Sequence, residues 1–164
     1  MSDGGPAAAA REHLLAAHAD AIDAVLDAAD AVATVDVDAT APTNWFRLDD
    51  GRPATTDRDA LVPALRAELE TRGARDVLPA LLSAAVDAAG YDLAATPVPA
   101  PPYVTVTSTG PVLRATVADG RLVVRIDCFD VVRGVKQENG TGVAYARSAS
   151  EPAAALSVTF VPAE

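Results

Sequence analysis

The chemistry that this sequence could offer centres on its single cysteine. Cys128 lies in the segment GRLVVRIDCFDVV, between Asp127 and Asp130. A cysteine acts as a nucleophile only in an accessible, electropositive setting, and a nearby carboxylate raises the pKa of a thiol. The two histidines of the chain lie far earlier in the sequence, so no base is close to Cys128. What Cys128 can do therefore depends on which way its side chain points.

The strands around Cys128 predict the direction of its side chain. Residues 112–118 and 121–132 alternate apolar and polar side chains on either side of Asp119-Gly120, a pair that predicts a two-residue hairpin turn. Cys128 has the parity of the apolar residues that precede it, and alternate residues of a strand face opposite sides of a sheet. We therefore expect Cys128 to be a buried, structural residue and Asp127 to face away from it.

The opposite face of this hairpin carries arginines. With a turn at Asp119-Gly120, Arg114 is predicted to lie directly opposite Arg125. Arg121 and Arg133 have the same parity as Arg125, and we call the four arginines the arginine strip. Like charges directly opposite each other destabilise a strand pair, and a guanidinium suits a carboxylate or a phosphate. Two interpretations are open: a contact surface for an acidic partner protein, or a solvated face with local Arg–Asp pairs.

No other combination of residues predicts a catalytic, metal or nucleotide site. His13 and His18 are five residues apart, so they do not share a helix face, and no cysteine–histidine cluster is present. The sequence has neither a phosphate-binding glycine loop nor a serine-nucleophile motif. We therefore expect a protein that is not an enzyme and that uses no metal or cofactor.

Charge is distributed unevenly along the 164 residues, whose formal net charge is −10. Residues 1–99 contain 17 acidic and 7 basic residues, whereas residues 100–164 contain 6 of each. High net charge favours solubility, and concentrated salt screens the resulting self-repulsion. The composition is typical of halophilic proteins, and the arginine strip would lie on an otherwise acidic molecule.

Three features predict a cytoplasmic protein. No apolar run is long enough to span a membrane, and the first residues lack the basic and apolar segments of a secretory signal. A single cysteine cannot form an internal disulfide. We expect no membrane partner.

Apolar spacing predicts that residues 6–96 form a helical half, after a frayed terminus at residues 1–5. Residues 34–56 show no sustained period and are expected to form a loop that Trp45 and Phe46 anchor to the core. Caps and apolar stripes predict three helices, over residues 6–32, 57–72 and 75–89.

A proline-rich spacer at residues 97–102 precedes a change to the period of strands. In residues 103–164, strands are expected over residues 103–107, 112–118, 121–132, 143–147 and 156–161. Helices followed by an antiparallel meander are typical of the α+β class. The prediction is one domain, residues 6–164, with three N-terminal helices packed on one face of a four- to five-stranded antiparallel meander sheet.

The segment PPYVTVTSTGPVLRATVADGRLVVRIDCFDVVR, residues 101–133, resembles small acidic proteins of halophilic archaea that form a domain family with no assigned function. Residues 55–93 resemble the same proteins. The resemblance covers most of the chain and implies an α+β domain. It carries over no catalytic residues.

Our leading hypothesis is a non-catalytic protein-interaction module that binds an acidic partner protein through the arginine strip. An alternative is a small-molecule-binding protein or enzyme, with a pocket between sheet and helices near His18, Trp45, Phe46 and Cys128. A second alternative is a degenerate winged-helix DNA-binding regulator, because three helices precede a hairpin. Nucleic acid is disfavoured, since the third helix has no base-reading side chain after Arg75 and the helical half is acidic.

Overall fold

The structure is a computed structural model, and it describes residues 5–33, 45–137, 140–148 and 151–163. The helices are α1 (Pro6–Ala17), α2 (Ala19–Val32), α3 (Arg58–Thr71), α4 (Ala74–Ala88) and the short α5 (Pro152–Ala155). The strands are β1 (Trp45–Arg47), β2 (Pro53–Thr55), β3 (Val104–Thr107), β4 (Gly110–Val117), β5 (Gly120–Ile126), β6 (Phe129–Gln137), β7 (Gly140–Arg147) and β8 (Leu156–Pro162).

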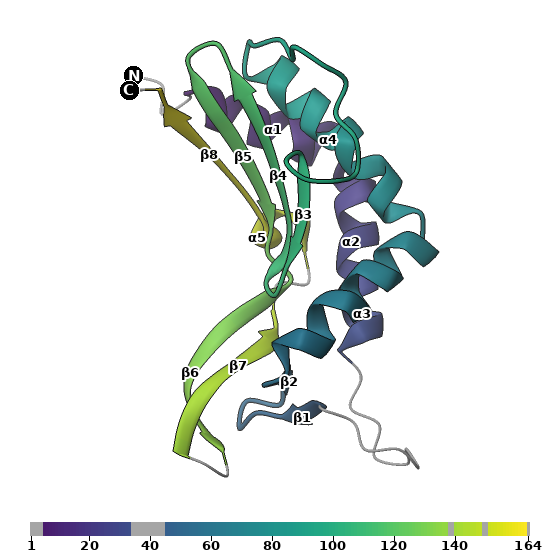
Figure 1. Ribbon diagram of the computed structural model, residues 1–164, viewed down its shortest axis with the longest axis vertical. Helices are drawn as coiled ribbons and strands as arrows, with labels where there is room; N and C mark the ends of the chain where they lie inside the picture. The colour runs from purple at the N-terminus through teal and green to yellow at the C-terminus, as the bar shows by residue number, and fades with distance from the viewer. Residues whose placement is uncertain (1–4, 34–44, 138–139, 149–150, 164) are drawn as a thin grey trace.

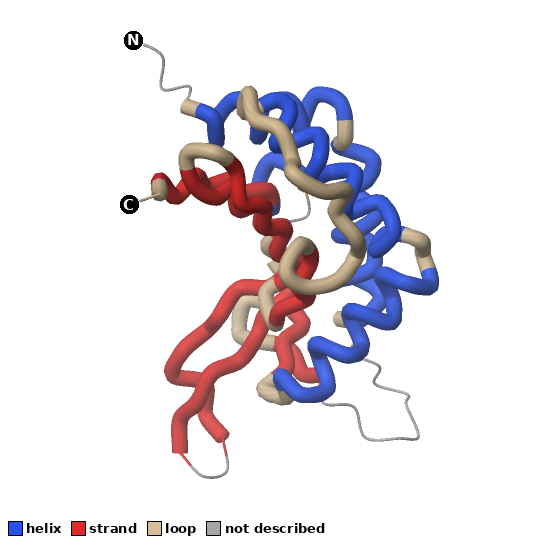
Figure 2. Tube along the Cα trace, turned by 45° about the horizontal axis from the view of Figure 1, so that its top comes forward, coloured by secondary structure: helices blue, strands red, loops and turns tan. Residues whose placement is uncertain are grey.

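The α+β class is confirmed, but the single predicted sheet is wrong. The strands form two antiparallel four-stranded sheets, in the orders β3-β4-β5-β8 and β1-β2-β7-β6 (Figure 1). Helices α1, α3 and α4 contact the first sheet, and α2 packs against α3 and α4. Figure 2 shows the long helices gathered on one side of the strands. The main core lies between the helices and the inner face of β3-β4-β5-β8.

The N-terminal helix predicted over residues 6–32 is two helices. The chain leaves helical geometry at His18, where φ is −129° and ψ is 21°. The reason is packing: both helices contact α4, but α1 also lies against β8, whereas α2 lies mainly against α3. A straight helix could not direct its apolar stripe at both sets of neighbours.

The loop predicted over residues 34–56 contains a strand pair. Strands β1 and β2 pair antiparallel, and β2 continues the sheet through β7. Each has only three residues, too few for an alternating pattern to be recognised. Residues 34–44 lie outside the described part of the chain.

The two later helices and the hairpins follow the sequence more closely. Of the two residues that could cap this helix in the sequence, Thr56 and Asp57, it is Asp57 whose side chain accepts a hydrogen bond from the Ala60 backbone N–H and caps α3. The hairpin turn predicted at Asp119-Gly120 instead uses Ala118 and Asp119, and Val117 pairs with Gly120. A Cβ at Gly120 would collide with the Val161 carbonyl of β8, so this strand position requires glycine. The shift is by two residues, so every side chain keeps its predicted face.

The strand predicted over residues 121–132 is divided between the two sheets. β5 ends at Ile126 and β6 begins at Phe129, with Asp127 and Cys128 at the crossing. The crossing is held by backbone hydrogen bonds: Asp127 N–H donates to Ala155 O at 2.9 Å, and Cys128 N–H donates to Thr109 O at 2.6 Å. The apolar alternation breaks at this point, because Cys128 and Phe129 are consecutive buried residues and the exposed Asp130 has the parity of Cys128.

Candidate functional site

Three arginines surround one valine on the outer face of β3-β4-β5-β8. Arg114 of β4 lies directly opposite Val123 of β5, and Arg121 and Arg125 flank Val123 on the same face of β5. All three arginines are exposed, and Val123 is half-buried. We call Arg114, Arg121 and Arg125 the arginine face.

The predicted Arg114–Arg125 pair is therefore wrong in its geometry. Val112, and not Arg114, lies opposite Arg125. Arg114 is instead a diagonal neighbour of both Arg121 and Arg125. Diagonal residues are about 7–8 Å apart, farther than directly opposite ones, so the like charges repel less strongly. The two-residue change in register converts a destabilising pair into a tolerable cluster.

One carboxylate lies at the edge of the arginine face. Arg125 Nε is 3.7 Å from Asp127 Oδ1, a partly exposed and weak contact. Partial burial raises the pKa of the Asp127 carboxyl, while Arg125 lowers it and Asp130 raises it. Within the described residues, neither Arg114 nor Arg121 forms an ion pair. These two guanidiniums can therefore meet an external carboxylate.

The rest of this sheet face is neutral. Thr105 and Thr116 are exposed beside the arginines, and Val161 of β8, opposite Arg121, is 42% exposed. Thr159 lies opposite Val123 and completes the row that begins at Arg114. The face thus combines cations, hydroxyls and small apolar side chains, a mixture that suits an acidic protein surface.

Arg133 does not belong to the arginine face. It lies on β6, opposite Val143 of β7, in the other sheet. Its parity predicted that it would share a face with Arg125, but the chain passes to the other sheet at Asp127 and Cys128. Of the four residues of the predicted arginine strip, only Arg114, Arg121 and Arg125 therefore share a surface.

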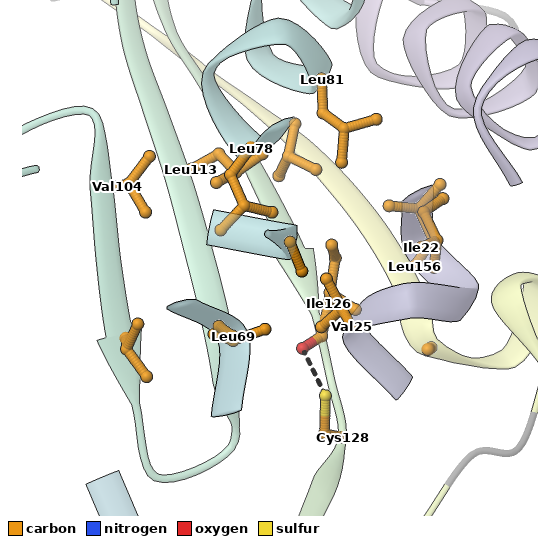
Figure 3. Packing of buried hydrophobic residues seen from close by; sticks show 14 of the residues in the cluster. Ile22, Val25, Leu69, Leu78, Leu81, Val104, Leu113, Ile126, Cys128 and Leu156 are labelled. Atoms are coloured by element: carbon orange, nitrogen blue, oxygen red, sulfur yellow. Dashed lines mark hydrogen bonds between the residues drawn. The ribbon is translucent and has the colours of Figure 1, made fainter. Parts of the chain in front are cut away.

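Cys128 is buried in the main core, as expected. Its side chain has no exposed surface, and Sγ lies 3.6 Å from Ile126 O (Figure 3). Figure 3 shows Val25 and Ile126 beside it. Burial raises the pKa of the thiol to about 12, with Arg147 opposing this and Asp127 adding to it. A thiol in this position is protonated and inaccessible, so it is no nucleophile.

The other residues of the predicted pocket lie in three different surroundings. Trp45 packs on Phe129 with ring centroids 5.9 Å apart, at the main core. Phe46, the next residue, belongs to a second apolar cluster. His18 lies at the α1–α2 junction, where its ring contacts that of His13 at 5.5 Å. Trp45 and Phe46 thus anchor their segment to different clusters, Trp45 to the one that holds Cys128 and Phe46 to the other.

Arg147 is an interior charge that the sequence analysis did not single out. Its side chain is 8% exposed and donates hydrogen bonds to the carbonyls of Cys128 at 2.9 Å, Leu26 at 3.3 Å and Ser148. Arg147 lies directly opposite the buried Phe129, so the two side chains share one face of the sheet. This shared face could have predicted the burial of Arg147, but only if the register of β6 and β7 were known.

The described residues contain neither a group of metal-binding side chains nor a helix that could span a membrane. No group of three or more histidine, cysteine, aspartate or glutamate side chains there could hold a metal ion. None of the helices in the same residues has the length and apolar character needed to cross a bilayer.

Comparison with known proteins identifies a family whose function is unknown. Residues 8–161 match the family DUF7988, whose description is domain of unknown function. The search of curated proteins gives no match. Solved structures give none either.

Proposed function

The chain belongs to the family DUF7988, and we propose that it is a non-catalytic protein-interaction module that binds an acidic partner through the arginine face. The observation that supports this proposal most strongly is the exposed cluster of Arg114, Arg121 and Arg125 around Val123. Among the described residues, the helices pack on the opposite, inner face of this sheet. The three arginines are therefore available to a partner.

Charge supports an acidic protein as the partner. The arginine face contributes three positive charges on a molecule of net charge −10, and 17 of its 23 acidic residues precede residue 100. An acidic partner would be repelled by most of the surface and attracted at this face. Such an arrangement gives orientation and specificity more than raw affinity.

We infer further that the protein works in the cytoplasm of a cell with concentrated internal salt. The acidic composition supports this inference. At about 1 M salt the Debye length is only about 3 Å, so long-range attraction is lost. Close guanidinium–carboxylate hydrogen bonds and the burial of Val123 would then provide the remaining affinity.

A defined acidic peptide provides the test. Labelled protein is titrated with oligoglutamate in low salt, with oligoglutamine as the neutral control, and backbone amide shifts are followed by NMR. We expect shifts in residues 112–116 and 121–125. The Arg114→Ala/Arg121→Ala variant should bind about tenfold more weakly.

The matched control removes the same charge elsewhere. Arg58 and Arg66 are exposed on α3, and Arg58→Ala/Arg66→Ala should leave the affinity unchanged relative to the parent. Equal weakening by both double variants would show a nonspecific charge effect. That result, or oligoglutamate shifts confined to other elements, would refute the proposal.

The alternative of DNA binding has less support from the fold. The third predicted helix, α4, turns its apolar face to α1 and the sheet, and its exposed positions include Asp76 and Asp87. Its one arginine, Arg75, is held by Glu70. Duplex DNA would meet carboxylates on this helix, so phosphate contact is unfavourable.

A further inference from the structure

Strand β8 has a free edge beside the arginine face. It is the last strand in the order β3-β4-β5-β8, and it pairs with β5 over seven consecutive residues without a register shift. Figure 1 shows β8 at the left margin of the upper sheet, with α1 behind the sheet and not at that margin. An edge strand presents one row of backbone N–H and C=O groups to its surroundings.

The hydrogen bonds at the two ends of β8 show which of its residues face outward. Ala163 N–H donates to Asp119 O at 2.8 Å, and the bond of Asp127 at the other end has the same parity. Residues of an antiparallel pair bond to their partner strand alternately, so Val158 and Phe160 direct their N–H and C=O groups away from β5. Within the described residues, no hydrogen bond satisfies these four groups.

Leu156 marks one end of this free edge, because its own outward groups are satisfied. Its N–H donates to Pro152 O, and its carbonyl accepts a hydrogen bond from Arg11 Nε at 3.2 Å. The unpaired stretch is thus centred on Val158 and Phe160. An added strand of about five residues would satisfy it.

The other long edge strand is protected against pairing, whereas β8 is not. β6 has a register shift between Arg133 and Val135, and it carries the charged Lys136. Bulges and lysines are devices by which natural proteins prevent edge strands from pairing. β8 has no register shift and no charged residue. The remaining edge strands, β1 and β3, have only three and four residues. A long, regular and unprotected edge indicates one that a partner covers.

The outer face of β8 continues the arginine face. Val161 lies directly opposite Arg121, and the row four residues away joins Ser157 to Arg125. A strand added to β8 would place side chains in both rows, about 10 Å from β5, which is twice the spacing of neighbouring strands. A guanidinium and a carboxylate that reach toward each other over the small side chain between them can span this distance. The added strand should therefore carry acidic residues four positions apart.

The inner face of β8 is apolar. Val158 and Phe160 pack on the main core but are only half-buried, so apolar surface remains at this edge. The ring of Tyr91 stacks on that of Phe160, with centroids 5.6 Å apart, and holds it in place. The residues of an added strand that lie between its two acids face this surface, because alternate side chains face opposite sides. They should therefore be apolar.

We propose that the acidic partner binds as an extended segment that adds an antiparallel strand to β8. The proposal rests on the proposed interaction function and specifies the form of the partner: acids at positions i and i+4 on the outer face, and apolar residues at i+1 and i+3 on the inner face. In strand addition, main-chain hydrogen bonds give affinity and alternate side chains give specificity. The antiparallel direction continues the pairing of every strand in this sheet.

A peptide with the core Glu-Val-Thr-Val-Glu is the probe, and the same peptide with glutamine in place of glutamate is its neutral control. Binding is measured by calorimetry in low salt, and amide hydrogen exchange is followed by NMR. We expect the probe to slow the exchange of Val158 and Phe160 about tenfold or more, because their N–H groups gain acceptors. The neutral peptide should bind about tenfold more weakly.

Two methylated peptides separate strand addition from a contact of charges alone. In the antiparallel arrangement, the two valines of the probe direct their N–H groups to β8, whereas its threonine and glutamates direct theirs away. N-methylation of both valines should therefore abolish binding. N-methylation of the threonine and the second glutamate, with the same charges and the same number of methyl groups, should preserve it.

Val158→Pro makes the corresponding change in the protein. It removes an outward N–H and leaves the hydrogen bonds to β5 in place, a substitution that edge strands tolerate. The variant should lose the probe and still bind oligoglutamate through the arginine face.

The results that would overturn strand addition differ from those that would refute the arginine face. No binding of the probe, equal affinities of the two methylated peptides, unchanged exchange of Val158 and Phe160, or full binding of the probe by folded Val158→Pro would overturn it. Dimerisation of the free protein that Val158→Pro abolishes would identify a second copy as the occupant and would also overturn it. With oligoglutamate binding intact, each of these results leaves the interaction function standing, whereas loss of oligoglutamate binding refutes that function.

Discussion

Arg147 Nε of β7 lies 2.8 Å from Asp30 Oδ1 of α2 and thereby joins one sheet to the helical layer. The two partners differ in burial, because the Arg147 side chain is 8% exposed and that of Asp30 is 64% exposed. The same guanidinium binds the carbonyl of Cys128, where the chain crosses between the sheets. Arg147 therefore fixes the relative position of both sheets and α2.

Replacing the two partners should have unequal effects on stability. Arg147→Ala leaves the carbonyls of Leu26 and Cys128 without a charged donor, and we expect a loss of about 2–4 kcal/mol in the free energy of unfolding. Asp30→Asn removes only an exposed charge and should cost less than about 1 kcal/mol. Urea denaturation measures both values. Similar costs for the two variants would show that the ion pair, and not the carbonyl network, carries the stability.

Cys128 should resist alkylation while the protein is folded. Burial raises the pKa of its thiol to about 12, and the side chain has no exposed surface. We expect iodoacetamide near neutral pH to leave it unmodified until denaturant is added. A second cysteine introduced by Ala80→Cys, at an exposed position of α4, should react at once and serves as the internal control. Rapid labelling of Cys128 in the folded parent would contradict its buried position.

Asp127 should make the stability of the protein decrease as pH rises through its pKa. Its folded-state pKa is raised above the ordinary value of 3.8, chiefly because burial disfavours the charged form. The contribution of such a carboxyl is greatest below the unfolded pKa and is lost as pH rises through the folded one. Asp127→Asn should therefore gain stability relative to the parent as pH rises from the ordinary pKa of the carboxyl through its raised folded-state pKa.

Asp92→Asn is the matched control for this pH effect, because Asp92 is an exposed loop residue with the same charge. Its stability difference from the parent should show no such gain. Thermal unfolding across the pH range gives both curves. A gain of equal size in the two variants would assign the effect to net charge instead of the burial of Asp127.

Gly110 should be much less replaceable than Gly134. Both have positive φ, 140° and 75°, so alanine is strained at either position. A Cβ at Gly110 would also collide with the Ile126 carbonyl, whereas open space surrounds the one at Gly134. We expect Gly134→Ala to cost about 1 kcal/mol and Gly110→Ala at least about 3 kcal/mol in the free energy of unfolding. Equal costs would mean that β4 and β5 can separate locally without penalty.

Sequence periodicity was sufficient for the elements that pack on one side only. The capped start of α3, the burial of Cys128 and the faces of β4 and β5 all follow from the 3.6- and 2-residue periods. The faces were correct despite a shifted register, because a shift by two residues preserves parity. The same parity placed Arg114, Arg121 and Arg125 on one surface.

The remaining features depend on contacts between distant segments. The apolar stripe of the first predicted helix continues through His18, so the local pattern does not mark the change of direction there. At Cys128 the alternation breaks, but a break does not reveal that the following strand joins another sheet. The contact of Arg52 with Asp130 joins residues that are 78 apart in the chain. Long-range relationships of this kind decide which residues share a site, and a single sequence does not contain them.

The most direct test of the proposed interaction is quantitative capture of partners by tagged protein from a lysate of the source organism, in molar KCl. Three baits are compared: the parent, Arg114→Ala/Arg121→Ala/Arg125→Ala, and the control Arg58→Ala/Arg66→Ala/Arg72→Ala, which loses the same charge from α3. The account predicts an acidic protein that the parent and the control capture equally and that the arginine-face variant loses. A partner that all three baits capture equally, or the absence of any partner, would contradict it.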